Sequence, residues 1–158
     1  MQTNQTTQPL VRRDVELKDF ENSRLSFRHD SRYILRDTPD TGQVFLENDV
    51  SNIILTDPRE ALDIGETLTN LVDVLMVNYA EKGYQDIKRT DIAEREFGNA
   101  KGKGFVFSYI NEGINVESET MVVSNGTNTF IVYHIFPLNM KSMAHELFNP
   151  MKGSFAAE

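Results

Sequence analysis

Hydrophobic and polar residues alternate along residues 101–136, and this pattern predicts three antiparallel strands joined by tight turns. The expected corners are Asn111-Glu112-Gly113 and Asn125-Gly126. Asparagine and glycine tolerate the positive φ angles that short hairpin turns require, so an Asn-Gly pair between alternating runs is a strong hairpin signal. The segment therefore predicts a β-meander in the second half of the chain.

Shorter apolar runs predict further strands in the first half. Residues 15–20 and 24–27 alternate on either side of a polar turn, which indicates a hairpin. Brief apolar runs at residues 44–46 and 53–55 are typical of strands. Residues 33–35 fit either a short strand or an anchor to the core.

Apolar residues recur every three or four positions over residues 61–79, which predicts one long helix. Asp57-Pro58 suits its start, because aspartate accepts hydrogen bonds from free N–H groups and proline fits the first helical position. Gly65 is unfavourable inside a helix, so the alternative is a later start, with residues 58–65 as a separate turn. Gly83 predicts the end of the helix.

Helical spacing returns over residues 140–148, and Asn149-Pro150 is expected to interrupt it before a last turn at residues 151–155. Between the two helices, residues 87–97 are expected to form a strand and residues 98–104 a turn. Strands and helices are segregated along the chain, which favours an α+β fold. We expect an antiparallel sheet of about six to seven strands flanked by one long central helix and a C-terminal helix, an α/β/α sandwich.

Five short segments carry a resemblance to a known fold family. They are Leu25-Ser26-Phe27 with Tyr33, the helix end Leu75-Met76-Val77-Asn78-Tyr79, the run Gly98…Gly104-Phe105…Tyr109, the turn Ser124-Asn125-Gly126 before Phe130-Ile131-Val132-Tyr133, and the closing Phe148…Gly153-Ser154-Phe155. Together they resemble the Mog/PsbP-like superfamily, which includes PsbP, the Ran-binding Mog proteins and DcrB-type lipoproteins. The resemblance covers about residues 24–155. It implies an antiparallel sheet flanked by helices, a role in binding or assembly, and no catalytic residues.

Composition narrows the classes of function. The net charge is -8 and basic residues form only short clusters, which argues against a nucleic-acid binder. No apolar run approaches the ~20 residues of a membrane-spanning helix. The chain has no cysteine, which excludes disulfides and thiolate chemistry.

Polar residues 1–13 are expected to be a flexible tail, followed by a single α+β domain at residues 14–158. The first residues show no signal-peptide pattern. The compartment and the oligomeric state stay open.

Three histidine-containing segments have residue types that occur in catalytic or metal sites. His29-Asp30-Ser31 has the residue types of a catalytic triad, but adjacent side chains diverge and a triad converges from separate segments. His134 lies in an apolar strand and is expected to be a satisfied, half-buried core residue. His145-Glu146 lacks the second histidine of a zinc motif and is expected on an exposed helix face.

Acidic and glycine-rich segments give no specific ligand site either. Glu112, Glu117 and Glu119 could face a cation, although a solvated sheet face explains them better. Asp37, Asp40, Glu47 and Asp49 lack the spacing of a calcium loop. Gly98–Gly104 lacks the spacing of a phosphate loop and is expected to be a hairpin loop. Asn4-Gln5-Thr6 and Asn125-Gly126-Thr127 match glycosylation acceptors. We expect no cofactor and no metal.

One apolar cluster near the C-terminus is a candidate partner surface, although core packing of the terminal helix is the favoured interpretation. Its members are Met140, Met143, Leu147, Phe148 and Met151. The expected function is a non-catalytic binding or assembly module that acts through protein–protein contacts, such as an accessory subunit of a larger complex. The alternatives are a small-ligand carrier or enzyme with a pocket on the concave face of the sheet, and a lipid-anchored envelope protein of the DcrB type.

Overall fold

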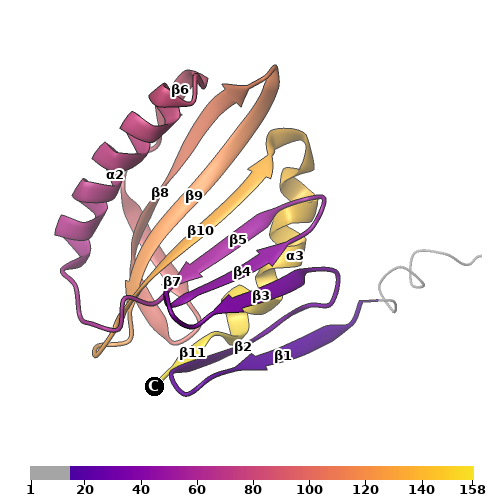
Figure 1. The fold of residues 1–158 in the computed structure, drawn as a ribbon, viewed down its shortest axis with the longest axis vertical. Helices are drawn as coiled ribbons and strands as arrows, with labels where there is room; N and C mark the ends of the chain where they lie inside the picture. The colour runs from indigo at the N-terminus through magenta and orange to yellow at the C-terminus, as the bar shows by residue number, and fades with distance from the viewer. Residues whose placement is uncertain (1–14) are drawn as a thin grey trace, which may run out of the picture.

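The computed structural model describes residues 15–158, and the tail expected at residues 1–13 lies outside them. The described residues form an α+β fold with antiparallel sheets and two α-helices, as the sequence predicts (Figure 1). The strands and helices, in chain order, are β1 (Leu17–Glu21), β2 (Leu25–Asp30), β3 (Ile34–Thr38), β4 (Gln43–Glu47), β5 (Asn52–Thr56), α2 (Ile64–Glu81), β6 (Gln85–Arg89), β7 (Ala93–Phe97), β8 (Ala100–Asn111), β9 (Ile114–Ser124), β10 (Thr129–Pro137), the 3₁₀ turn η1 (Leu138–Met140), α3 (Lys141–Ser154) and β11 (Ala156–Ala157).

The strands form two sheets. The main sheet has eight strands in the order β3-β4-β5-β10-β9-β8-β6, and β7 also pairs with β8. A smaller sheet has the order β1-β2-β11, so the predicted first hairpin forms but belongs to a separate layer. The main sheet has more strands than the six to seven expected, because residues 85–97 form two short strands instead of one.

The predicted meander is the centre of the main sheet. Glu112 and Gly113 have φ angles of +52° and +80° and connect β8 to β9, so Asn111 pairs directly with Ile114. The second corner is a four-residue loop at 125–128 instead of a two-residue turn. Its geometry is set by the Asn125 side chain, whose Oδ1 accepts hydrogen bonds from two backbone N–H groups of the loop at 3.0 and 2.9 Å.

The hairpin loop expected at Gly98–Gly104 is wrong for most of its length. Only Gly98 and Asn99 form the turn, and β8 begins at Ala100. Residues 101–104 pair with β7 on one side and β9 on the other. A Cβ atom on Gly102 would overlap the carbonyl oxygen of Val122. Glycine therefore marks a close approach of two backbones inside the sheet, which the sequence alone does not distinguish from a turn.

Helix α2 begins at Ile64, so the start predicted at Asp57 is wrong and the later alternative is nearer. Asp63 is the N-cap, and its Oδ1 accepts a hydrogen bond from the backbone N–H of Glu66 at 2.8 Å. The Asp57 carboxylate instead accepts hydrogen bonds from the Arg24 guanidinium, which tie the smaller sheet to the main one. The predicted stop at Gly83 is confirmed, with a φ angle of +78°.

Helix α3 runs from Lys141 to Ser154 without a break, so the interruption predicted at Asn149-Pro150 is wrong. Proline removes one backbone hydrogen bond, but the apolar face of the helix continues past it. Its buried residues are Ala144, Leu147, Phe148 and Met151. Burial of this face on both sides of the proline offsets the lost hydrogen bond.

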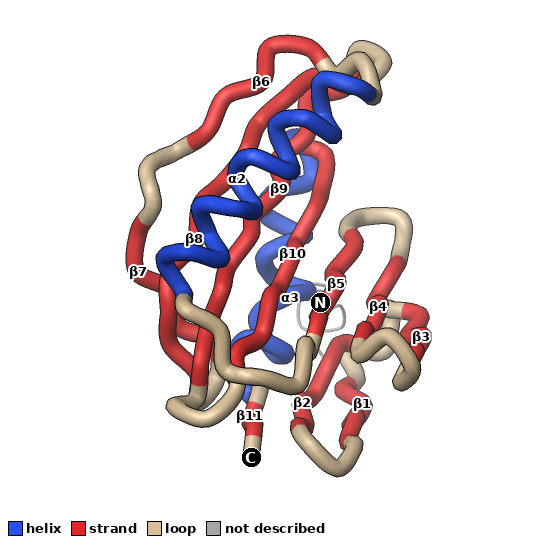
Figure 2. Tube along the Cα trace, turned by 60° about the vertical axis from the view of Figure 1, so that its left-hand side comes forward, coloured by secondary structure: helices blue, strands red, loops and turns tan. Residues whose placement is uncertain are grey.

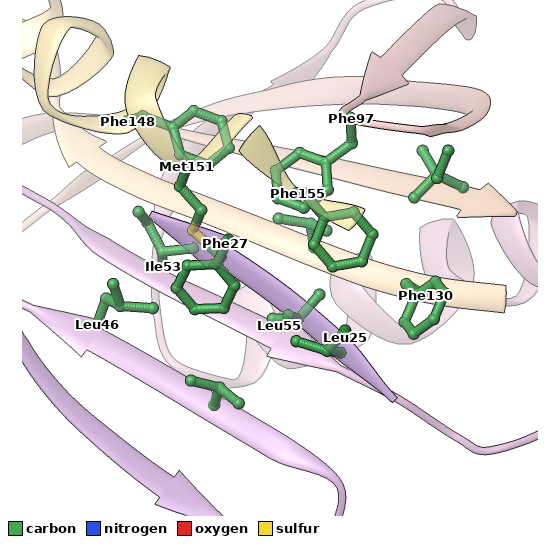
Figure 3. Packing of buried hydrophobic residues seen from close by; sticks show 14 of the residues in the cluster. Leu25, Phe27, Leu46, Ile53, Leu55, Phe97, Phe130, Phe148, Met151 and Phe155 are labelled. Atoms are coloured by element: carbon green, nitrogen blue, oxygen red, sulfur yellow. The ribbon is translucent and has the colours of Figure 1, made fainter. Parts of the chain in front are cut away.

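The main sheet has a core on each face. On one face, α3 and the smaller sheet pack on β4, β5 and β10, and side chains from all of these elements converge (Figure 3). On the other face, Leu68 and Tyr79 of α2 pack on Phe105, Phe107 and Val122. Figure 2 shows α2 lying along β8 and β9, to one side of β5, β4 and β3.

Candidate functional site

The face of the main sheet that carries α2 is only partly covered. Helix α2 packs on β8 and β9 and reaches β6, whereas β10, β5 and β4 continue the sheet beyond it. Five apolar side chains of these three strands lie on the α2 side, because Val122 of the α2 core pairs with Ile131 and the register carries this side across the sheet. They are Phe45, Ile54, Ile131, Tyr133 and Ile135. All five are only half-buried, and we call them the open face. Ile131 is at its border, because it also packs against the α2 core.

The opposite side of the same three strands is sealed. Leu46, Ile53, Leu55, Phe130 and Val132 alternate with the residues of the open face and are fully buried beneath α3 and the smaller sheet. Successive side chains of a strand point to opposite faces. The same strands are therefore fully covered on one face and only partly covered on the other, so the half-burial of the open face reflects the missing cover on the α2 side.

The centre of the open face carries no charge. The nearest charged pair is at its edge, where Arg36 lies 3.2 Å from Glu47 and its guanidinium sits 4.2 Å from the ring centroid of Phe45. Burial raises the pKa of the Tyr133 hydroxyl, so this group stays protonated at neutral pH. Uncharged apolar and aromatic side chains ringed by polar groups are typical of the core of a protein interface.

A hollow of ≈ 350 Å³ adjoins one end of the open face. It lies between the β4–β5 turn, the β8–β9 hairpin, the end of β10 and Tyr84, the residue that follows α2 and Gly83. Tyr84 stacks on Tyr109 with ring centroids 4.4 Å apart and an interplanar angle of 3°. Polar and apolar groups share the remaining lining.

The candidate partner surface near the C-terminus is divided by the structure. Leu147, Phe148 and Met151 are 2%, 1% and 0% exposed and belong to the core beneath α3. Met140 is half-buried, and Met143 is exposed at 43%. These placements follow the core-packing interpretation for three of the five residues. A partner surface made by all five stays a prediction, and it lies away from the open face.

The residues of His29-Asp30-Ser31 do not converge. The Asp30 carboxylate accepts hydrogen bonds from the Arg32 guanidinium at 2.9 and 2.8 Å, and this interaction lowers the pKa of Asp30. The Nδ1 atom of His29 contacts the backbone carbonyl of Asp30 at 2.9 Å, and not its carboxylate. The segment is a buried structural corner.

His134 is a core residue, but it is not the satisfied, half-buried histidine that the sequence predicts. It is fully buried, and neither ring nitrogen has a hydrogen-bond partner among residues 15–158. Its ring packs on Phe148 with centroids 4.2 Å apart, and the ring of His145 lies edge-on at 5.6 Å. His145, expected on an exposed helix face, is half-buried because it fills this space. Burial lowers the pKa of His134 to about 3.

Glu117 and Glu119 share one face of β9, as predicted, and each has a basic partner. Arg95 Nε lies 2.8 Å from Glu119 and Lys141 Nζ lies 3.2 Å from Glu117. These ion pairs replace the solvated face that the sequence predicts. Within residues 15–158, no three His, Asp or Glu side chains are grouped so that they could hold a metal ion. None of the helices in the same range is long and apolar enough to cross a membrane.

Comparison with known proteins identifies the fold. Neither a protein-family model nor a curated protein sequence matches this chain. Several solved structures are similar to it, and two of them illustrate the likeness. The cyanobacterial PsbP of Synechocystis sp. PCC 6803 has 13% identity, a TM-score of 0.55, and coverage of 90% of this chain and 92% of that one. LpqN of Mycobacterium tuberculosis, involved in cell envelope biogenesis, has 12% identity, a TM-score of 0.51, and coverage of 98% of both chains.

This chain has the PsbP-like fold. The fold implied by the resemblance to the Mog/PsbP-like superfamily is confirmed by these neighbours. At such low identities the likeness concerns the path of the chain and transfers no function. The site has to be argued from this chain's own residues.

The sequence reasoning missed the open face and the hollow. One signal was present: β5 and β10 are apolar on both sides of the strand, which is typical of a sheet covered on both faces. The sequence offers only one long helix for the second face of a wide sheet. Counting strands against helices would have indicated uncovered apolar surface.

Proposed function

We propose that this protein is a non-catalytic module that binds a partner protein through the open face. One observation carries the proposal: apolar side chains of β4, β5 and β10 are only partly buried on that face, whereas those on the opposite face are fully buried. Contiguous exposed apolar surface on a folded chain marks interaction sites. The predicted role in binding or assembly agrees with this surface.

The dimensions of the open face favour an amphipathic helix as the occupant. Neighbouring strands lie about 4.8 Å apart, so β10, β5 and β4 together span about 10 Å, which is close to the diameter of an α-helix. Helix α2 already packs on the neighbouring strands of the same face. A partner helix with an uncharged apolar stripe would lie beside it and complete the layer.

The side chains of the open face and of the adjoining hollow support a role without catalysis. Nucleophilic and acid–base catalysis both need a reactive side chain within hydrogen-bond reach of a second group. The open face consists of Phe45, Ile54, Ile131, Tyr133 and Ile135, none of which is a base or an activated nucleophile. The hollow is lined by no histidine, lysine or cysteine. Its one carboxylate, Asp49, is exposed.

Site-specific crosslinking tests the proposal directly. The chain has no cysteine, so Ile54→Cys introduces a single thiol at the centre of the open face for a photoreactive label. Val77→Cys provides the matched control, because Val77 lies on α2 and is 56% exposed. After irradiation in native extract, the label at residue 54 is expected to capture one partner whose crosslinked peptide is an amphipathic helix.

Competition distinguishes a docking surface from a merely reactive position. The same partner should be retained by unlabelled Val77→Glu protein and lost by Ile54→Glu protein, with both variants folded by circular dichroism. Equal retention by the two glutamate variants would overturn the proposal. Capture at residue 77 but not at residue 54 would do the same.

The likeness to LpqN supports a second proposal, an association with the cell envelope. LpqN is involved in cell envelope biogenesis, and the sequence resemblance includes lipid-anchored proteins of the DcrB type. A lipid anchor needs a lipobox cysteine, and the 158 residues contain no cysteine. Reading the coding sequence upstream of Met1 tests this proposal: a lipobox there supports it, and its absence contradicts a lipid anchor.

A further inference from the structure

The hollow beside the open face has the size and the rigidity of a small-molecule site. Its volume of ≈ 350 Å³ lies at the lower end of the range of roughly 300–1,000 Å³ for ligand pockets. The wall made by Tyr84 is fixed by local structure. Gly83, with a φ of +78°, turns the chain after α2, and the backbone N–H of Tyr84 donates to the carbonyl of Tyr79 at 3.1 Å.

An aromatic surface forms one wall. Tyr84 and Tyr109 stack in parallel, and the ring of Tyr79 packs 4.7 Å from that of Tyr109. Aliphatic side chains continue this surface across the same sheet face, since Val116 pairs with both Tyr109 and Pro137. They are Ile114, Val116, Ile135 and Pro137. A ligand therefore needs an apolar face toward this surface.

The rim is polar and is made mostly of amides. Asn52 and Asn111 have no side-chain hydrogen-bond partner among residues 15–158, so their amides are available as both donors and acceptors. Asn48 is already engaged, since its Oδ1 accepts from the backbone N–H groups of the β4–β5 turn at 2.8 and 2.9 Å. Asp49 adds one carboxylate.

The hydroxyl of Tyr109 is the most informative group of the lining. The residue is only 6% exposed, yet its hydroxyl has no hydrogen-bond partner among the described residues. Burial raises the pKa of this hydroxyl, so it remains a donor at neutral pH. The hydroxyl oxygen is not among the fully buried atoms without a partner, so it is open to solvent and can donate a hydrogen bond to a ligand.

The lining of the hollow is unfavourable for anionic ligands. No lysine or arginine lines the hollow, and Asp49 adds a negative charge to it. The cation in contact with its aromatic wall is Lys82, whose Nζ lies outside the lining and 5.9 Å from the ring centroid of Tyr84.

An apolar sheet face beside Tyr84 and a rim of amide, carboxylate and phenol groups suit a ring with C–H groups on one face and hydroxyl groups at its edge. We propose that the hollow binds a neutral saccharide, with its ring against Tyr84 and its hydroxyls on Asn52, Asn111 and Tyr109. The hollow shares Ile135 with the open face, and its test uses the purified chain without a partner protein.

Ligand-observed NMR with the full chain tests the saccharide site. The probes are glucose, galactose, N-acetylglucosamine and their disaccharides, with inorganic phosphate and an uncharged tripeptide as comparison ligands. We expect saturation transfer to at least one saccharide and none to phosphate or the tripeptide. The chain has no tryptophan, so a matching change in tyrosine fluorescence gives an affinity.

Matched tyrosine variants locate the binding. Tyr109→Phe removes only the hydroxyl and is expected to weaken saccharide binding about two- to tenfold, the worth of one hydrogen bond. Tyr133→Phe makes the same change on the open face, outside the hollow, and is expected to leave the affinity unchanged. No transfer to any saccharide, stronger transfer to phosphate or the tripeptide, or equal affinity in the two variants would each overturn the inference.

Discussion

Two adjacent isoleucines of β5 differ in burial because they point to opposite faces of the main sheet. Ile53 points beneath α3 and the smaller sheet and is fully buried, whereas Ile54 points to the α2 side and is half-buried. The residue type and the strand are the same, so the difference comes only from what covers each face. We infer that the sealed face holds most of the stability of this fold and that the open face is free to serve binding.

The two faces also differ in how they are closed. The sealed face is covered by elements from both ends of the chain, since β2 and β11 pair with each other and α3 packs on β2. The open face relies on α2 alone, which reaches only one side of the sheet. A site that must admit a partner cannot contribute its full apolar area to folding, so the two functions are separated by face.

Alanine substitution of the two isoleucines is the strongest test of this contrast. Ile53→Ala leaves a cavity in a closed core and is expected to lower the free energy of unfolding by about 3 kcal/mol. Ile54→Ala removes the same atoms from a half-solvated site and is expected to cost about 1 kcal/mol. Urea unfolding of the two variants measures both values.

The ratio matters more than either value. Because the two substitutions remove the same atoms from one strand, effects on β-propensity and on the unfolded chain nearly cancel. If Ile54→Ala costs as much as Ile53→Ala, the open face is covered in solution and the contrast fails.

The sealed face has one weak point, His134. Its pKa is lowered to about 3 by burial, with further contributions from His145 and Lys152, whereas an unfolded histidine titrates near 6.5. The unfolded state therefore binds a proton more readily between these values, and the stability falls as the pH drops through that window. We expect a loss of about 2 kcal/mol between pH 7 and pH 5.

The contributions of neighbouring charged groups to the pH dependence of stability can be separated from that of His134. Glu119 faces it across the strand pair but is held by Arg95, and the lowered pKa of Asp30 acts below its ordinary value near 3.8. His134→Phe is expected to flatten the dependence between pH 5 and pH 7, and His145→Gln to retain most of it. Unfolding in urea at several pH values tests this, and an unchanged slope in His134→Phe would contradict it.

The sequence predicts which strands and helices this fold contains better than it predicts the residues at which they begin and end. Alternation over residues 101–136 identifies the meander, and the spacing over residues 61–79 identifies α2, because both depend on which side chains face the core. The errors come from residues with two possible uses. Asp57 can cap a helix or bind Arg24, Gly102 can turn the chain or admit another backbone, and Pro150 can end a helix or be tolerated within one.

The candidate site is harder to predict for a different reason. The open face is defined by which strands α2 fails to reach, and this depends on the strand order β5-β10-β9-β8, which joins segments distant in sequence. The hollow likewise brings Tyr84 against Tyr109 and the β4–β5 turn. Neither can be derived from local periodicity. The resemblance to the Mog/PsbP-like superfamily identifies the fold, but it does not identify the surface.

A small gain in stability at the β8–β9 turn would sharpen the comparison of faces. Glu112 has a φ of +52°, which asparagine tolerates better than glutamate. Glu112→Asn is expected to raise the free energy of unfolding by about 0.5 kcal/mol. Glu112 is exposed and belongs to neither core, so its gain should add equally to Ile53→Ala and to Ile54→Ala. If the gain appears in only one of the two double variants, the turn is energetically coupled to the face that carries the alanine substitution. The stability contributions of the two faces would then not be independent.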